Sequence, residues 1–310
     1  MKLLCVWLCV AMALGLVVWA QAPTPASIAD DPQSRITLDV TRVSILFTVT
    51  DKKGRFVTNL TKDDFEVIEN KRRQNILEFT AESGLPLRLG LLIDTSNSIR
   101  DRFRFEQEAA IEFLNSLLRP RTDRAMIVSF DTAAEMVSDL TDDPEKLINT
   151  IRDLRPGGGT ALYDAIFNAC RDRLMKDQPR HKFRRAVVVL SDGDDNQSRY
   201  TREQALEMAQ KADVVVYTVS TNITRSPTDG DKVLRYLAAE TGGIALFPFK
   251  VEDLTQSFEN ISNQLRSQYN ILYRPEPLAT DGLFQPIEIR VKGRKDLVVR
   301  ARRGYYAPRL

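Results

Sequence analysis

Between residues 85 and 268, short segments that are almost entirely apolar alternate with longer segments whose apolar residues recur at helical spacing. Residues 87–93, 125–130, 186–190 and 214–219 are of the first kind, and we predict that they form strands. Strands that are buried on both faces and separated by amphipathic helices are typical of a mostly parallel sheet between two layers of helices. The sequence therefore predicts an α/β domain with a doubly wound, mostly parallel sheet.

Two segments with a β pattern flank this domain. Residues 35–84 predict about four short strands, and strand-like patterns return in residues 269–310. Each segment alone has too few strands for an independent sandwich. We therefore expect the two segments to pair into one β-sandwich, into which the α/β domain of residues 85–268 is inserted.

The N-terminal sequence predicts an export signal. Met1 and Lys2 are followed by an apolar run that reaches Ala20. This pattern is typical of a secretory signal peptide over residues 1–20, and the run is also long enough for a membrane anchor that is not cleaved. Residues 21–34 are rich in Pro, Ala and Asp and predict a flexible spacer. In either case we expect an exported protein of the periplasm, the cell envelope or the exterior.

Composition narrows the classes of function. A formal net charge of +2 is too small to indicate a nucleic-acid partner. The single histidine, His181, lies in a polar segment, so a histidine-rich zinc site is excluded. Without the signal segment, Cys170 is the only cysteine, so the mature chain has no internal disulfide. An exported chain without disulfides suggests a bacterial envelope protein.

The octet from Leu91 to Ser98 carries the first functional signal. Its apolar run ends at Asp94, and two serines, Ser96 and Ser98, follow at a spacing of two residues. The carboxyl ends of strands are where open parallel sheets place their binding sites. Carboxylate and hydroxyl oxygens suit Mg²⁺, Mn²⁺ or Ca²⁺. The alternative is that Ser98 caps the next helix and Asp94 is an ordinary loop acid.

Two further segments share these features. Three glycines, residues 157–159, precede Thr160 at the start of a predicted helix, and Asp192 follows the strand at 186–190. In a doubly wound sheet both segments emerge at the same edge as Asp94. Five oxygen side chains can therefore converge there and, with water, provide the octahedral shell that Mg²⁺ requires. They are Asp94, Ser96, Ser98, Thr160 and Asp192.

This combination of Asp-x-Ser-x-Ser, Thr and Asp resembles the metal-ion-dependent adhesion site of the von Willebrand factor type A family. The order of elements over residues 87–267 also agrees with that family. The resemblance implies that Ser96 and Ser98 bind the metal directly. It also implies that the remaining residues of the site hold the metal directly or through water.

The flanks resemble the bacterial family often called the VWFA-related Acidobacterial domain. Residues 60–69 contain the Leu-Thr pair, the acids and the Phe-x-Val-x-Glu strand that this family favours, and residues 302–308 are similar to its close. That family often continues with an Asp-Gly turn, whereas this chain has Asn70 and Lys71. We therefore expect the strand, with the type of turn left open.

Hydroxyls are weak neutral ligands, so an ion held by only two acids remains electron-poor and can accept a carboxylate from a partner. We therefore expect a non-enzymatic module that binds an acidic side chain of a protein ligand, with no membrane insertion beyond a retained N-terminal anchor. One alternative is a metal-dependent hydrolase, for which Asp194 or Asp195 is the nearby candidate for a general base. Another is a structural envelope protein with a vestigial site.

Overall fold

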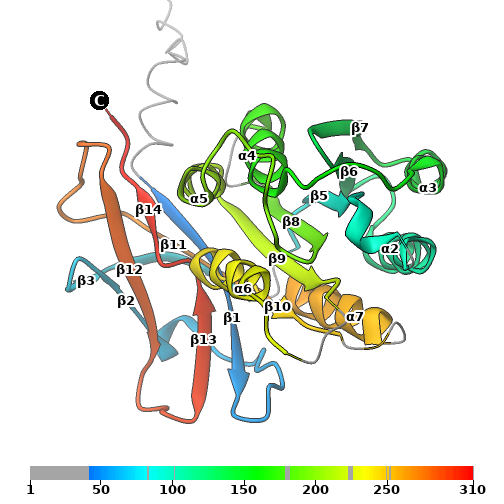
Figure 1. Ribbon diagram of the computed structural model, residues 1–310. Helices are drawn as coiled ribbons and strands as arrows, with labels where there is room; N and C mark the ends of the chain where they lie inside the picture. Colours follow the sequence, from blue (N-terminus) through cyan, green and yellow to red (C-terminus); the bar gives the residue numbers. More distant parts are fainter. Residues whose placement is uncertain are drawn as a thin grey trace, which may run out of the picture.

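The computed structural model describes residues 42–81, 84–100, 102–178, 182–222, 226–248, 250 and 253–309. The predicted signal segment and spacer lie outside these ranges, as does His181. The described residues form an α/β unit and a β unit that stand side by side (Figure 1). None of the helices in the described ranges is both long enough and apolar enough to cross a membrane.

A six-stranded sheet, in the order β10-β9-β8-β5-β6-β7, lies at the centre of the α/β unit. Its strands are β5 (Leu87–Asp94), β6 (Arg124–Phe130), β7 (Ala134–Thr141), β8 (Arg184–Ser191), β9 (Val214–Ser220) and β10 (Ala245–Leu246). All neighbouring pairs are parallel except β6 with β7. Strands β5, β8 and β9 are buried along their whole length, which explains their continuous apolar runs. The predicted doubly wound sheet is confirmed.

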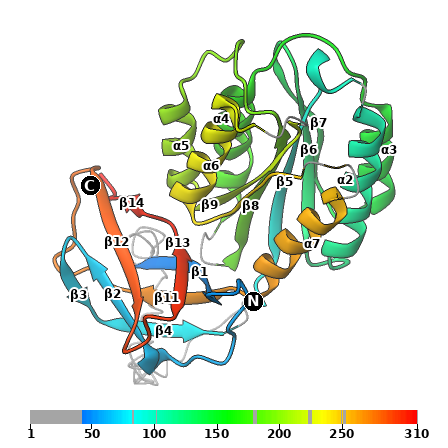
Figure 2. The ribbon, with the colours of Figure 1, turned by 60° about the horizontal axis from the view of Figure 1, so that its bottom comes forward.

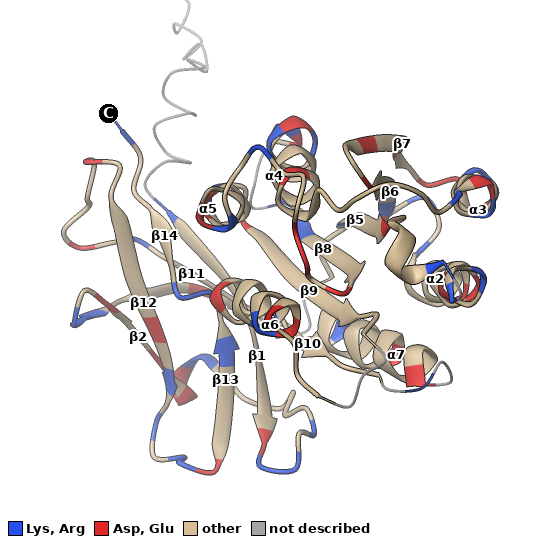
Figure 3. Ribbon diagram, in the orientation of Figure 1, with Lys and Arg blue, Asp and Glu red and all other residues tan. Residues whose placement is uncertain are grey.

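Helices cover both faces of this sheet (Figure 2). One face packs against α2 (Phe103–Leu117), α3 (Pro144–Asp153) and α7 (Asp253–Arg266). The other face packs against α4 (Leu162–Asp172), α5 (Arg202–Lys211) and α6 (Asp229–Thr241). Short 3₁₀ helices are η1 (Lys62–Asp64), η2 (Asn97–Ile99) and η3 (Leu174–Lys176). Lys and Arg are interspersed with Asp and Glu along the helices (Figure 3).

The long helix that follows the octet does not begin next to Ser98. Ser98 lies in η2, whereas α2 begins at Phe103 with Arg102 as its N-cap residue. The Ser98 hydroxyl contacts the Ser96 hydroxyl at 2.9 Å. The alternative in which Ser98 caps the long helix is therefore wrong. The physical reason is that the chain leaving β5 first bonds to neighbouring loops, with Thr95 N donating to the Phe130 carbonyl at 2.9 Å.

The flanking segments form two four-stranded sheets, in the orders β13-β1-β11-β4 and β14-β12-β2-β3. The first flank supplies β1 (Val43–Asp51), β2 (Phe65–Glu69), β3 (Arg72–Gln74) and β4 (Ile76–Thr80). The second supplies β11 (Tyr269–Tyr273), β12 (Phe284–Val291), β13 (Leu297–Ala301) and β14 (Gly304–Tyr306). Both sheets therefore mix strands from the two flanks. They enclose a separate apolar core in which Phe47 contacts the rings of Phe65 and Tyr269.

The turn between β2 and β3, whose type the sequence left open, is a tight one. Asn70 and Lys71 both have positive φ angles, 49° and 65°. Left-handed φ at both central residues is the signature of a two-residue type I′ hairpin, so β3 begins directly after Lys71. Residues 74–79, which have one continuous strand-like pattern, are divided, because β3 ends at Gln74 in one sheet and β4 begins at Ile76 in the other.

Arg302 connects the two units. Its guanidinium pairs with Asp213, just before β9, and its Nη2 donates to the Ser44 carbonyl of β1 at 2.9 Å. The chain crosses between the units before Leu87 and after Arg266. Because β5 starts at this crossing, its carboxyl end lies at the edge of the parallel sheet that faces away from the β-sandwich.

Candidate metal site

Three loops meet at the carboxyl edge of the sheet: residues 95–98 after β5, 157–161 before α4 and 192–198 after β8. Strands β5 and β8 are neighbours, and the order of the sheet reverses between them, since β6 lies on one side of β5 and β8 on the other. This reversal is the position at which doubly wound sheets bind ligands. The fold therefore brings the three predicted segments to one place.

Backbone hydrogen bonds hold these loops against one another. Gly157 N donates to the Thr95 carbonyl at 2.6 Å and joins the first loop to the second. Asn196 N donates to the Thr160 carbonyl at 3.0 Å, and Thr160 N donates to Asn196 Oδ1 at 3.0 Å, which joins the second loop to the third. The relative positions of the candidate ligands are thus fixed by the fold without any ion.

Asp94 is the last residue of β5 and is fully buried. Ser96 N donates to its Oδ1 at 2.9 Å, and the Ser191 hydroxyl donates to its Oδ2 at 2.6 Å. Burial raises the pKa of Asp94 to about 6, the two serines oppose this change, and the negative charge of Asp192 adds to it. A cation would relieve both the burial and the repulsion, because an opposite charge stabilises the ionised carboxylate.

The other predicted ligands lie on the same three loops. Ser96 and Thr160 are buried, Asp192 is half-buried and Ser98 is exposed. The hydroxyl oxygens of Ser96 and Ser98 lie 2.9 Å apart. The structure thus gathers the loops that carry all five residues, while metal binding by these residues stays a prediction.

The donors fit a hard divalent cation, because they are carboxylate and hydroxyl oxygens. Among the described residues, no three His, Cys, Asp or Glu side chains lie close enough together to hold a metal. An ion at this edge would therefore need the hydroxyls of Ser96, Ser98 and Thr160 beside Asp94 and Asp192, which is the composition that the sequence predicted.

The loop that carries Asp192 is positioned by a close contact between two glycines. A Cβ atom on Gly230, near the start of α6, would lie 2.2 Å from the Asp192 carbonyl oxygen. A Cβ atom on Gly193 would lie 2.3 Å from the Gly230 carbonyl oxygen, and Gly193 has a φ of 84°. Only glycine allows the two backbones to approach this closely.

Three residues around the site were not assigned a role from the sequence. Ser191 orients Asp94, and Asn196 binds the backbone of Thr160. Glu106 of α2 is buried and interacts electrostatically with the carboxylates of the site. The sequence contained a signal for this role, because Glu106 is the one charged residue on the buried apolar face of α2.

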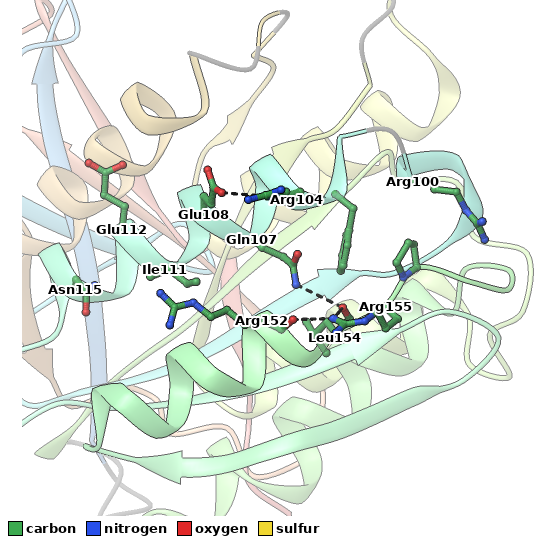
Figure 4. A pocket seen from close by; sticks show the side chains of 12 residues that line it. Arg100, Arg104, Gln107, Glu108, Ile111, Glu112, Asn115, Arg152, Leu154 and Arg155 are labelled. Carbon is green, nitrogen blue, oxygen red and sulfur yellow. Dashed lines mark hydrogen bonds and ion pairs between the residues drawn. The ribbon is translucent and has the colours of Figure 1, made fainter.

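A groove of about 810 Å³ lies between α2 and the end of α3 (Figure 4). It opens beside the candidate site, since its lining includes Arg100, just after Ser98, and Pro156, just before Gly157. Gln107 crosses the groove and donates to the Ile151 carbonyl. The charged side chains of the lining are Arg100, Arg104, Glu108, Glu112, Arg152 and Arg155. Both signs are present, so the charge of the groove does not select one class of ligand.

The fold and the site define an α/β protein with hydroxyl and carboxylate groups at the switch point of its sheet. Residues 89–194 match the family model of the von Willebrand factor type A domain. This match agrees with the family that the motif resembles. The narrower resemblance of the flanks to the Acidobacterial family stays a prediction. A search of the curated proteins found no match.

Solved structures share this fold. Proximal thread matrix protein 1 from the mussel byssus is 16% identical with a TM-score of 0.53, over 64% of this chain and 51% of that one. Another structure of the mussel protein, described as having a zinc-occupied MIDAS motif, is 17% identical with a TM-score of 0.52, over 64% and 50%. A von Willebrand factor type A protein from Catenulispora acidiphila is 14% identical with a TM-score of 0.51, over 76% and 70%. This chain spans about half the length of the mussel protein. At these identities the similarity establishes the fold alone.

Proposed function

We propose that this protein is an exported, non-enzymatic binding module that uses a divalent cation to bind a carboxylate of a protein partner. The ion, Mg²⁺ or alternatively Mn²⁺ or Ca²⁺, would be held by Asp94, Ser96, Ser98, Thr160 and Asp192. It would supply a Lewis-acidic position for one oxygen of the partner's acidic side chain.

The environment of Asp94 is the observation that carries this proposal. Its carboxylate is buried and repelled by Asp192, and two serines fix its orientation. Ser98, at the rim of the same site, is exposed. The arrangement suits an ion that is bound by buried oxygens on the protein side and is accessible to a partner on the solvent side.

Calorimetric titration of the metal-free protein tests the ion. We expect one site for Mg²⁺ that is lost in Asp94→Ala and retained in Glu135→Ala, which removes an exposed acid of β7 in the same sheet. Parallel titrations with Mn²⁺, Ca²⁺ and Zn²⁺ identify the preferred ion, since a mussel relative is described with zinc at its MIDAS motif. Absence of heat with every ion would favour the structural alternative with a vestigial site.

A peptide display library tests the partner chemistry. Selection in Mg²⁺ is expected to enrich peptides that contain Asp or Glu, and the enrichment should disappear in EDTA and with Asp94→Ala. Replacing the selected acid by its amide provides the matched control, because the amide keeps the shape of the side chain and removes its charge. Equal enrichment with and without EDTA would contradict a metal-mediated contact.

The hydrolase alternative is tested by turnover of ester and phosphoester substrates with the metal-loaded protein. Of its two candidate bases, Asp195 already accepts hydrogen bonds from Tyr163 N at 3.0 Å and from the Ser198 hydroxyl at 2.6 Å. Asp194 is exposed, and its pKa is raised chiefly by desolvation. Turnover that is lost in Asp194→Asn would establish the enzyme.

Export is the part of the proposal that rests on residues 1–34 alone. Fusing this segment to a reporter that is active only outside the cytoplasm tests it. We expect activity with the native segment and none when the apolar run is interrupted by charged residues.

A further inference from the structure

Glu106 is a charged residue in an apolar setting. It lies on the face of α2 that carries Phe103, Ala110 and Phe113, and only 1% of it is exposed. Neither of its carboxyl oxygens has a hydrogen-bond partner among the residues that the structure describes. A buried carboxylate without partners is costly unless another charge compensates it. We therefore looked for a group that compensates the charge of Glu106 when it is ionised.

Arg102, one turn earlier on the chain, does not fully provide that compensation. Its charge lowers the pKa of Glu106, but burial dominates and raises that pKa to about 8. The Arg102 Nη1 donates to the Thr221 carbonyl rather than to Glu106. Its Nε and Nη2 have no hydrogen-bond partner within the described part of the chain. The two side chains thus interact through charge without a hydrogen bond.

Glu106 also interacts with the candidate metal site. The negative charges of Asp94 and Asp192 both disfavour its ionised form. When all four groups are ionised, the carboxylates of Glu106, Asp94 and Asp192 carry three negative charges and Arg102 carries one positive charge. Two negative charges are then left without compensation. A divalent cation supplies that compensation. Since no three acids here are close enough to hold a metal, Glu106 would act at longer range than a direct ligand.

We propose that Glu106 is a third carboxylate beside the metal site, a positioning residue whose negative charge strengthens cation binding without direct ligation. This inference rests on the proposed function, because it requires the ion at Asp94 and Asp192. This role differs from that of a purely structural residue, because it predicts that the affinity for the metal depends on the charge of Glu106.

Glu106→Gln tests the role directly, because the amide keeps the size of the side chain and removes its charge. We expect the Kd for Mg²⁺, measured by calorimetry, to rise by about 10-fold or more. Above about pH 8, where Glu106 is ionised in the folded metal-free protein, we also expect the metal-free variant to melt at a higher temperature than the wild type, because a buried unpartnered charge is removed. Glu106→Asp should restore part of the affinity. Glu108→Gln is the matched control, since this glutamate is on the same helix with a side chain that is 64% exposed, and it should change neither quantity.

Arg102→Met provides a second test with the opposite sign. Removing this positive charge should lower the Kd for Mg²⁺ several-fold. This variant tests the same electrostatic effect if Glu106→Gln folds poorly. An unchanged Kd in both variants would overturn the role of Glu106 and leave the metal site itself standing. If the wild type binds no divalent ion, the proposed function fails and this inference fails with it.

Discussion

The Ser191 hydroxyl donates a hydrogen bond of 2.6 Å to Oδ2 of Asp94, so the last residue of β8 orients the last residue of β5. The same hydroxyl accepts from Gly193 N at 3.0 Å, which ties the loop of Asp192 to this pair. One serine therefore sets the orientation of one candidate ligand and the backbone path that leads to another.

Ser191→Ala is expected to weaken Mg²⁺ binding by about 10- to 100-fold, the usual effect of removing a group that orients a metal ligand. The measurement is calorimetric titration, with circular dichroism to verify the fold. Ser116→Ala is a suitable control, because this serine bonds to its own helix through the Phe113 carbonyl. An unchanged Kd would mean that the backbone alone orients Asp94.

Gly230→Ala is expected to destabilise the protein by roughly 1–3 kcal/mol, because overpacking forces the backbone to move. The added methyl would meet the Asp192 carbonyl oxygen at 2.2 Å, so metal affinity should fall as well. Urea denaturation and calorimetry measure the two effects. Gly157→Ala, also beside the site but with open space around its Cβ position, should change little.

The stability of the metal-free protein should decrease as the pH rises. The folded-state pKa of Glu106 is raised from 4.5 to about 8, and that of Asp94 from 3.8 to about 6. Between the unfolded and folded values the folded state binds more protons, so the free energy of unfolding falls with increasing pH and the loss is complete above about pH 8. The expected loss is of the order of a few kcal/mol.

Thermal melts in EDTA between about pH 5 and pH 9 measure this dependence. In Glu106→Gln only the contribution of Asp94 remains, and that contribution is complete near its folded-state pKa of about 6. The decrease in stability above about pH 6 should therefore disappear in this variant. A wild-type melting temperature that stays constant or increases over this range would contradict the assignment of both carboxyl groups as buried and uncompensated in the absence of metal.

Arg302→Ala is expected to lower the free energy of unfolding by roughly 1–3 kcal/mol, because it leaves Asp213 and the Ser44 carbonyl without a partner. The Arg302 side chain is only 12% exposed. Urea denaturation that follows both units should also show less cooperative unfolding. Arg290→Ala, from a surface pair with Glu288 in which Arg290 is 57% exposed, should have almost no effect.

Much of the α/β unit could be predicted from local patterns. The capping box at Thr201 and Gln204 is present at the start of α5, and the apolar run of residues 186–190 lies within a fully buried strand. The division of residues 74–79 between two sheets was not predictable, because both halves have the same strand-like pattern. Their separation depends on partners from the other end of the chain, such as Tyr273, which pairs with Ile76.

The sequence by itself determined the parallel sheet and the three segments that carry the candidate ligands, because burial on both faces and the end of a strand leave local patterns. Only the tertiary structure decided how these ligands are supported. The contact from Ser191 to Asp94 spans 97 positions in the chain, and Glu106 interacts electrostatically with Asp94 and Asp192 because α2 packs against this sheet. Burial makes the charges of Asp94 and Glu106 costly, and that cost is the physical reason to expect a cation where the three loops meet.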